Sequence, residues 1–125
     1  MALSESSISA VRNRVGEIAA LPDFRTGPWW LTFYLCGTAP DLGAVARELS
    51  ELDGINLQDA DGGFLYPKIP VGTDADNVVS VVVRVFEICR VGRVEFLHVD
   101  IDTSPDVVTS RFKMLFEPKS SDEQD

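Results

Sequence analysis

The residues best suited to chemistry lie in the stretch LHVDIDTSPD, which runs from Leu97 to Asp106. Within it, His98, Asp100 and Asp102 alternate with apolar residues. On an extended strand, side chains two positions apart point to the same side. An imidazole and two carboxylates on one side could hold a divalent metal ion. Alternatively, a carboxylate beside the imidazole could tune it as an acid or a base.

The spacing of these three residues argues against a metal site. Same-face neighbours on a strand are roughly 7 Å apart, because each residue advances the chain by ~3.3 Å. Ligands of one ion must lie closer together, and His98 is the only histidine of the chain. We therefore expect no metal and no other cofactor. The trio is most simply the polar face of a sheet, and catalysis by His98 with Asp100, beside Asp102, is the alternative.

The alternation of apolar and polar residues shifts by one position just before His98. Val94 and Phe96 are apolar at positions that share the parity of His98, whereas Glu95 is polar on the opposite parity. One extra residue in the strand would restore the alternation, so the sequence predicts a β-bulge near Phe96–Leu97.

Two further acidic stretches read DAD, and they place Asp59 and Asp61 in one and Asp74 and Asp76 in the other. The first resembles the start of a calcium loop, but the glutamate that would end a twelve-residue loop is replaced by Pro70. Asp is favoured in turns, so we expect these residues in exposed turns.

Other catalytic signals are weak. The chain contains no phosphate-binding loop and no GxSxG, GxGxxG or CxxC motif. Cys36 and Cys89 each lie among apolar residues, which is typical of reduced cysteines in a core.

The aromatic cluster WWLTFY offers a different kind of site. In a strand, Trp29 and Trp30 must face opposite sides, so one packs under the helices and the other faces outward with Tyr34. Exposed tryptophan and tyrosine side chains often anchor protein interfaces. Trp30 and Tyr34 are therefore candidate contacts for a partner, and filling of the core is the simpler explanation of the cluster.

These side chains must be positioned by the elements that the hydrophobic pattern predicts. Helices are expected over residues 5–20, with Ser4 as the cap, and over 38–54, with Thr38 as the cap. Strands are expected over 29–36, 55–58 and 64–66, with PKIPVG as an edge strand or a loop. The valine-rich segment 78–90 and residues 93–103 are expected to form a long hairpin that turns at Val91–Gly92. Residues 105–117 are expected to form a helix, with an edge strand over 109–116 as the alternative.

The predicted order is α-β-α-β-β-β-β-α in one domain, residues 1–117, followed by an acidic disordered tail, residues 118–125. This order suggests an α+β sandwich of ferredoxin-like type. Helices would pack on one face of a mainly antiparallel sheet of four or five strands. A strongly curved sheet wrapped around its helices is the alternative.

The charge balance favours a basic protein partner, and solubility alone is the simpler explanation of it. The chain has 11 basic and 20 acidic residues, a net charge of −9, which disfavours nucleic acid and anionic membranes. No apolar leader or membrane-length apolar run is apparent, so a cytoplasmic location is the default.

The sequence thus predicts a small acidic binding module of the inhibitor or immunity-protein type. Its expected contacts are Asp59, Asp61, Asp74, Asp76, Asp100, Asp102, Trp30 and Tyr34. A small enzyme or ligand-binding domain that uses His98 with Asp100 is the alternative. A homodimer built through a valine-rich sheet face over residues 78–85 is compatible with either function.

Overall fold

The computed structural model describes residues 3–25, 27–52, 54–57, 62–104 and 111–118. In chain order its elements are α1 (Glu5–Ala19), the short 3₁₀ helix η1 (Pro22–Phe24), β1 (Trp29–Cys36), α2 (Ala39–Leu49), β2 (Phe64–Leu65), β3 (Lys68–Val71), α3 (Ala75–Val91), β4 (Glu95–Asp102) and β5 (Phe112–Phe116).

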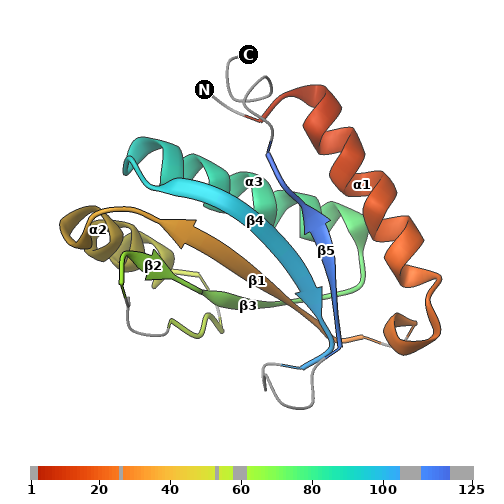
Figure 1. The fold of residues 1–125 in the computed structure, drawn as a ribbon. Helices are drawn as coiled ribbons and strands as arrows, with labels where there is room; N and C mark the ends of the chain where they lie inside the picture. The colour runs from red at the N-terminus through yellow and green to blue at the C-terminus, as the bar shows by residue number, and fades with distance from the viewer. Residues whose placement is uncertain (1–2, 26, 53, 58–61, 105–110, 119–125) are drawn as a thin grey trace.

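The strands form one open, antiparallel, five-stranded sheet with β1 and β4 at its centre (Figure 1). β5 pairs with the outer side of β4, while β2 and β3 both pair with the other side of β1. β2 and β3 act as one strand interrupted at Tyr66 and Pro67. Between them the Pro67 carbonyl still accepts a hydrogen bond from the Phe33 N–H, with an N···O distance of 3.0 Å. The predicted α+β class with an antiparallel sheet is confirmed.

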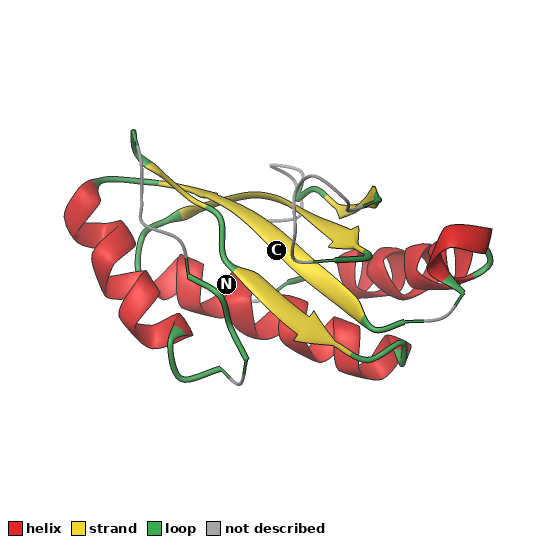
Figure 2. Cartoon of the chain, turned by 90° about the horizontal axis from the view of Figure 1, so that it is seen from below, coloured by secondary structure: helices red, strands yellow, loops and turns green. Residues whose placement is uncertain are grey.

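The helices and the sheet share one hydrophobic core. Figure 2 shows α2 and α3 beneath one side of the sheet, and α1 packs beside α3 and against β5. Every second residue of a strand points into this core, as expected for a sheet with one covered face. They include Trp29, Leu31, Phe33 and Leu35 of β1 and Val99 and Ile101 of β4. The remaining strand residues form the opposite, uncovered face of the sheet, which we call the open face.

Each helix begins at a side-chain cap. The Ser4 hydroxyl accepts a hydrogen bond from the Ser7 N–H, and the Thr38 hydroxyl accepts one from the Asp41 N–H, as the sequence predicts. Asp74 caps α3 by accepting from the Asp76 N–H. The second helix ends at Leu49, which is earlier than the expected stop at Gly54.

The predicted strand over residues 78–90 is wrong, because this segment is the helix α3. Its buried residues are Val78, Val79, Val82, Val85, Phe86 and Cys89, which follow a helical spacing. Ser80 and Arg84 lie exposed on the opposite side. Valine favours strands only weakly, and burial of this stripe against the sheet outweighs that preference. The expected long hairpin and its valine-rich sheet face are therefore absent.

The Val91–Gly92 segment is the end of α3 and not a hairpin turn. The Val94 N–H donates to the Cys89 carbonyl and the Arg93 N–H donates to the Arg90 carbonyl, which is the pattern of a Schellman motif. Arg93 takes the left-handed position, with φ of 61°. Gly92 is needed for a different reason: a Cβ there would lie 2.5 Å from Cγ2 of Val45 in α2.

The C-terminal part also differs from the expected helix over 105–117. Residues 112–116 form the edge strand β5, as the alternative proposed, while residues 105–110 and the tail 119–125 lie outside the described residues. The expected strand 55–58 is reduced to a single bridge between Asn56 and Lys68. The element order is α-β-α-β-β-α-β-β, and the ferredoxin-like arrangement is not confirmed, since the strands joined through α2 pair directly and antiparallel.

Candidate functional site

His98, Asp100 and Asp102 lie in a row on the open face. Tyr34 is paired with His98, Thr32 with Asp100, and Trp30 with Asp102. The register shifts between Tyr34/His98 and Leu35/Phe96, which leaves Leu97 as an extra residue in β4. The predicted bulge near Phe96–Leu97 is confirmed. It lets Phe96 point into the core while the trio points away from it.

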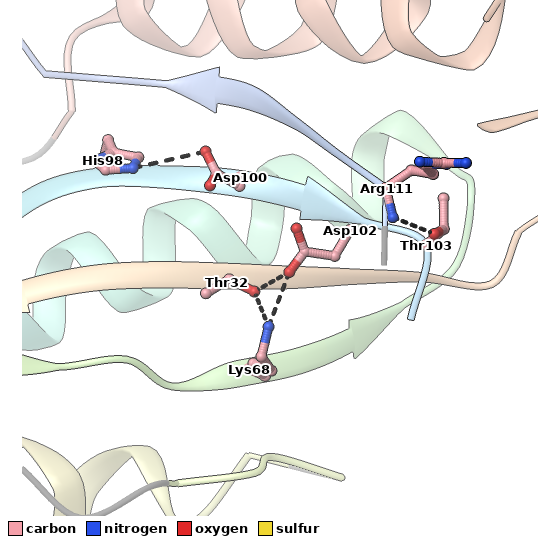
Figure 3. Close-up of polar contacts among 7 residues, drawn as sticks. All are labelled: Thr32, Lys68, His98, Asp100, Asp102, Thr103 and Arg111. Atoms are coloured by element: carbon pink, nitrogen blue, oxygen red, sulfur yellow. Dashed lines mark hydrogen bonds and ion pairs between the residues drawn. The ribbon is translucent and has the colours of Figure 1, made fainter. Parts of the chain in front are cut away.

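Asp102 belongs to a buried charge network (Figure 3). Lys68 Nζ lies 3.0 Å from Asp102 Oδ2 and donates to Thr32 Oγ1 at 2.7 Å, and the Thr32 hydroxyl donates to Asp102. The side chains of Lys68 and Asp102 are only 8% and 7% exposed. Three adjacent strands, β3, β1 and β4, supply one residue each. The charges of the ammonium and the carboxylate compensate each other, which allows both groups to be buried. The hydrogen bonds of this network connect the three strands.

Asp100 lies one pair further along β4 without such a close cation. It is 4% exposed, and its Oδ1 lies 3.7 Å from Nε2 of His98. Burial raises the pKa of Asp100, and this effect exceeds the opposing influence of His98, Tyr34 and Lys68. Asp100 is therefore a buried carboxylate whose negative charge the fold only partly compensates.

Four aromatic rings form a continuous row across the open face. Phe64 stacks on Tyr66 with centroids 6.2 Å apart, Tyr66 meets Tyr34 edge-on at 5.4 Å, and Tyr34 stacks on His98 at 4.0 Å. We call Phe64, Tyr66, Tyr34 and His98 the ring row. Phe64 and Tyr66 are each 37% exposed. The row thus offers aromatic surface to a ligand and ends beside Asp100.

Tyr34 links the ring row to Asp100. Burial raises the pKa of Tyr34 to about 12, and the Asp100 carboxylate contributes through its charge and through a hydrogen bond with the phenol. The phenol consequently stays neutral throughout the physiological range and remains a hydrogen-bond donor.

The geometry gives limited support to metal or acid/base chemistry. In the part of the chain that the structure describes, no group of three or more His, Cys, Asp and Glu side chains is placed to hold a metal ion. The His98–Asp100 separation of 3.7 Å exceeds hydrogen-bond distance. Unliganded catalytic pairs can be loose, so their acid/base role stays a hypothesis.

The other predicted contact residues are dispersed. Asp59 and Asp61 lie outside the described residues. Asp74 is the exposed cap of α3, and Asp76 forms an ion pair with Arg12 of α1. Trp30 is half-buried on the open face, while Trp29 faces the core, where its indole N–H donates to the Phe24 carbonyl. The structure therefore brings Trp30, Tyr34, Asp100 and Asp102 together on one face and leaves Asp74 and Asp76 away from it.

Sequence reasoning missed three residues of the site: Lys68, Tyr66 and Phe64. Pro67 and Pro70 flank Lys68 and favour an edge or a loop, so nothing local indicated a buried lysine. The alternation of Phe64, Tyr66, Lys68 and Pro70 along one side of the interrupted strand was the available signal.

The cysteines take no part in this site. Both are free thiols, and Cys89 is buried in α3 on the other side of the sheet, where burial raises its pKa to about 12. Such a thiol stays protonated and unreactive. Cys36 is half-buried on the open face.

Comparison of the chain with family models, with curated proteins and with solved structures finds no match. Within the described ranges, no helix has the length and apolar character needed to cross a membrane.

Proposed function

We propose that this chain is a binding module for a basic protein, of the inhibitor or immunity-protein type, and that the open face of the sheet receives a basic segment of that partner. The observation that carries the proposal is the ring row, which ends at a buried carboxylate. Arginine and lysine side chains bind both aromatic faces and carboxylates.

The partial exposure of the rings supports this function. Phe64 and Tyr66 present aromatic surface at the edge of the sheet, whereas Tyr34 and His98 are held in place by stacking. Side chains that are already ordered lose little entropy when a ligand binds. A cation over these rings gains about 0.5–1 kcal/mol at an exposed site.

Electrostatics supports a basic partner over an acidic one. The chain carries a net charge of −9, which steers cationic partners toward it. Asp100 is buried beside the ring row and only partly compensated. A guanidinium placed near it would favour the charged carboxylate, so binding is expected to lower the pKa of Asp100 and to release a proton below neutral pH.

The test is an NMR titration of the isotopically labelled chain with a peptide amide of alternating arginine and glycine. We expect saturable shifts of the ring signals of Tyr34, Tyr66 and His98 that weaken as salt is added. A peptide of the same length with glutamate in place of arginine is the control and is expected to give none.

Substitution of Tyr66 provides the matched comparison. Tyr66→Ala is expected to weaken peptide binding by about two- to fivefold, the equivalent of one exposed cation–π contact. Tyr66→Phe keeps the ring and is expected to bind like the wild type. Equal binding by Tyr66→Ala, or shifts confined to acidic residues of the helices, would rule out the open face as the binding surface.

A further inference from the structure

The open face continues beyond the ring row to a second row of residues. Strand pairing places Pro70, Trp30, Asp102 and Phe112 side by side across β3, β1, β4 and β5. Directly paired residues of neighbouring strands point to the same side of a sheet. Phe112 therefore shares the open face with Asp102. We call Pro70, Trp30 and Phe112 the Trp30 row.

The Trp30 row adds exposed apolar surface to the open face. Phe112 is 66% exposed, and Met114, which is paired with Asp100, is 49% exposed. In the part of the chain that the structure describes, five large hydrophobic side chains are exposed, and all except Val91 lie on this face: Phe64, Tyr66, Phe112 and Met114. Exposed apolar side chains that are scattered need no explanation, but side chains gathered on one face indicate a binding surface.

The separation between the two rows is set by β1. Tyr34 of the ring row and Trp30 lie on the same side of this strand, four residues and therefore about 13 Å apart. Between the rows lie Lys68, Thr32 and Asp100, none of which is more than 6% exposed. These three side chains offer little surface to a ligand, so we expect contacts chiefly at the two rows.

The charges at the two ends of the open face are opposite in sign. Glu95 begins β4 at the end that carries the ring row and is exposed, and the partly compensated carboxylate of Asp100 lies beside that row. At the other end, Arg111 and Lys113 are exposed and flank Phe112 in the chain. A cationic group is thus attracted to the ring row and repelled from Phe112, where an uncharged aromatic group fits better.

We propose that the open face recognises an extended segment of its partner in which a cationic and an aromatic side chain lie about 13 Å apart, with the cation on the ring row and the aromatic ring on the Trp30 row. In an extended chain these are residues i and i+4, which point to the same side. Residue i+2 then lies over the buried polar side chains and is small. This inference rests on the proposed function and adds a second determinant of partner choice.

The test compares three N-acetylated peptide amides in NMR titrations of the full chain. Arg-Thr-Gly-Thr-Phe carries both groups at the proposed spacing, Arg-Thr-Gly-Thr-Gly lacks the aromatic group, and Arg-Thr-Phe-Thr-Gly places it two residues from the arginine. We expect the first peptide to bind about three- to tenfold more tightly than the others, as one further aromatic contact provides. Only the first is expected to shift the indole N–H signal of Trp30. The indole of Trp29, which donates to the Phe24 carbonyl in the core, is the internal control.

Three variants locate the two contacts. Phe112→Ser is expected to remove the preference for Arg-Thr-Gly-Thr-Phe and to leave the affinity for Arg-Thr-Gly-Thr-Gly unchanged. Val91→Ser removes a side chain that is 72% exposed on the helical side and is expected to keep the preference. Tyr66→Ala acts at the ring row and is expected to weaken the binding of both peptides by the same factor.

The results separate this inference from the proposed function. If the arginine peptides bind the wild type with equal affinity, or if Phe112→Ser keeps the preference, the second determinant is overturned and the basic partner stands. If no arginine peptide binds, the proposed function is overturned and this inference with it.

Discussion

At the scale of single residues, the open face is unusual because its charged side chains are buried. Lys68, Asp100 and Asp102 are each less than 9% exposed although no helix covers them. Neighbouring side chains shield them: Thr32 lies between Lys68 and Asp102, and the stacked rings of Tyr34 and His98 lie beside Asp100. Polar groups that are buried in this way must be satisfied within the protein, because water reaches them poorly.

The Lys68–Asp102 pair gives the first stability prediction. Lys68→Met is expected to lower the free energy of unfolding by about 3–5 kcal/mol, since it leaves the Asp102 charge buried without its partner. Urea denaturation measures this loss. The double variant Lys68→Met with Asp102→Leu is expected to recover most of the lost stability. A double variant as unstable as the single one would show that the loss does not come from an unpaired Asp102 charge.

The raised pKa of Asp100 makes the free energy of unfolding depend on pH. Its pKa is raised in the folded state, so the folded protein binds this proton more tightly than the unfolded chain. Ionised Asp100 therefore destabilises the fold at neutral pH, and this penalty disappears as the pH falls through the folded and then the unfolded pKa. Asp100→Asn is expected to raise the free energy of unfolding near neutral pH and to lose that advantage in acid.

Urea melts of the wild type and of Asp100→Asn at several pH values measure this difference. Glu95→Gln is the control, because Glu95 is exposed on the same strand and surface substitutions usually change stability by less than about 0.5 kcal/mol. A constant difference between Asp100→Asn and the wild type at all pH values would contradict the assignment of the effect to the Asp100 proton.

At the scale of the elements, α3 shows how one apolar pattern can suit two structures. The sequence VVSVVVRVF contains strand-favouring residues and apolar positions of both parities, as a buried strand would. The same positions also follow helical spacing, and the cap at Asp74 and the Schellman motif at Arg93 mark the two ends of a helix. The cap at Asp74 was readable in the sequence, but Asp also indicates turns, and the left-handed position of the Schellman motif is occupied by Arg93 and not by the glycine that usually marks it.

Arg93 provides a test of the end of this helix. A left-handed residue other than glycine is strained by about 1–2 kcal/mol, and glycine would relieve this strain. Glycine also gives the unfolded chain more conformational freedom, which offsets part of the stability gained. Arg93→Gly is thus expected to raise the free energy of unfolding by up to about 1 kcal/mol. Arg93→Ala keeps a Cβ and is expected to bring no such gain in the same thermal or urea melts, and equal effects of the two variants would argue against the left-handed conformation.

At the scale of the whole molecule, the sheet separates two surfaces with different chemistry. The open face carries the ring row and the buried charges, whereas the helical side carries a groove between α2 and α3 that is lined by two arginines and two glutamates.

One core connects these surfaces, so the molecule is expected to unfold as a unit. Phe33 is fully buried and meets Phe96 edge-on at 5.6 Å. Phe33→Ala is expected to lower the free energy of unfolding by about 3–5 kcal/mol. Fluorescence of Trp29 and Trp30 and far-ultraviolet circular dichroism should still report one coincident transition. Separate transitions for the two probes would show that the sheet and the helices unfold independently.

The sequence by itself determined those features that depend on neighbouring residues. The caps at Ser4 and Thr38, the strand β1, the bulge near Leu97 and the shared side of His98, Asp100 and Asp102 all follow from local spacing, and the structure confirms them. The tertiary structure decided whether residues 75–91 form a helix, that β5 closes the sheet edge, and that Lys68 meets Asp102 across two strand pairings. These outcomes depend on which apolar surfaces bury one another and on contacts between residues far apart in the chain, and no local pattern specifies them.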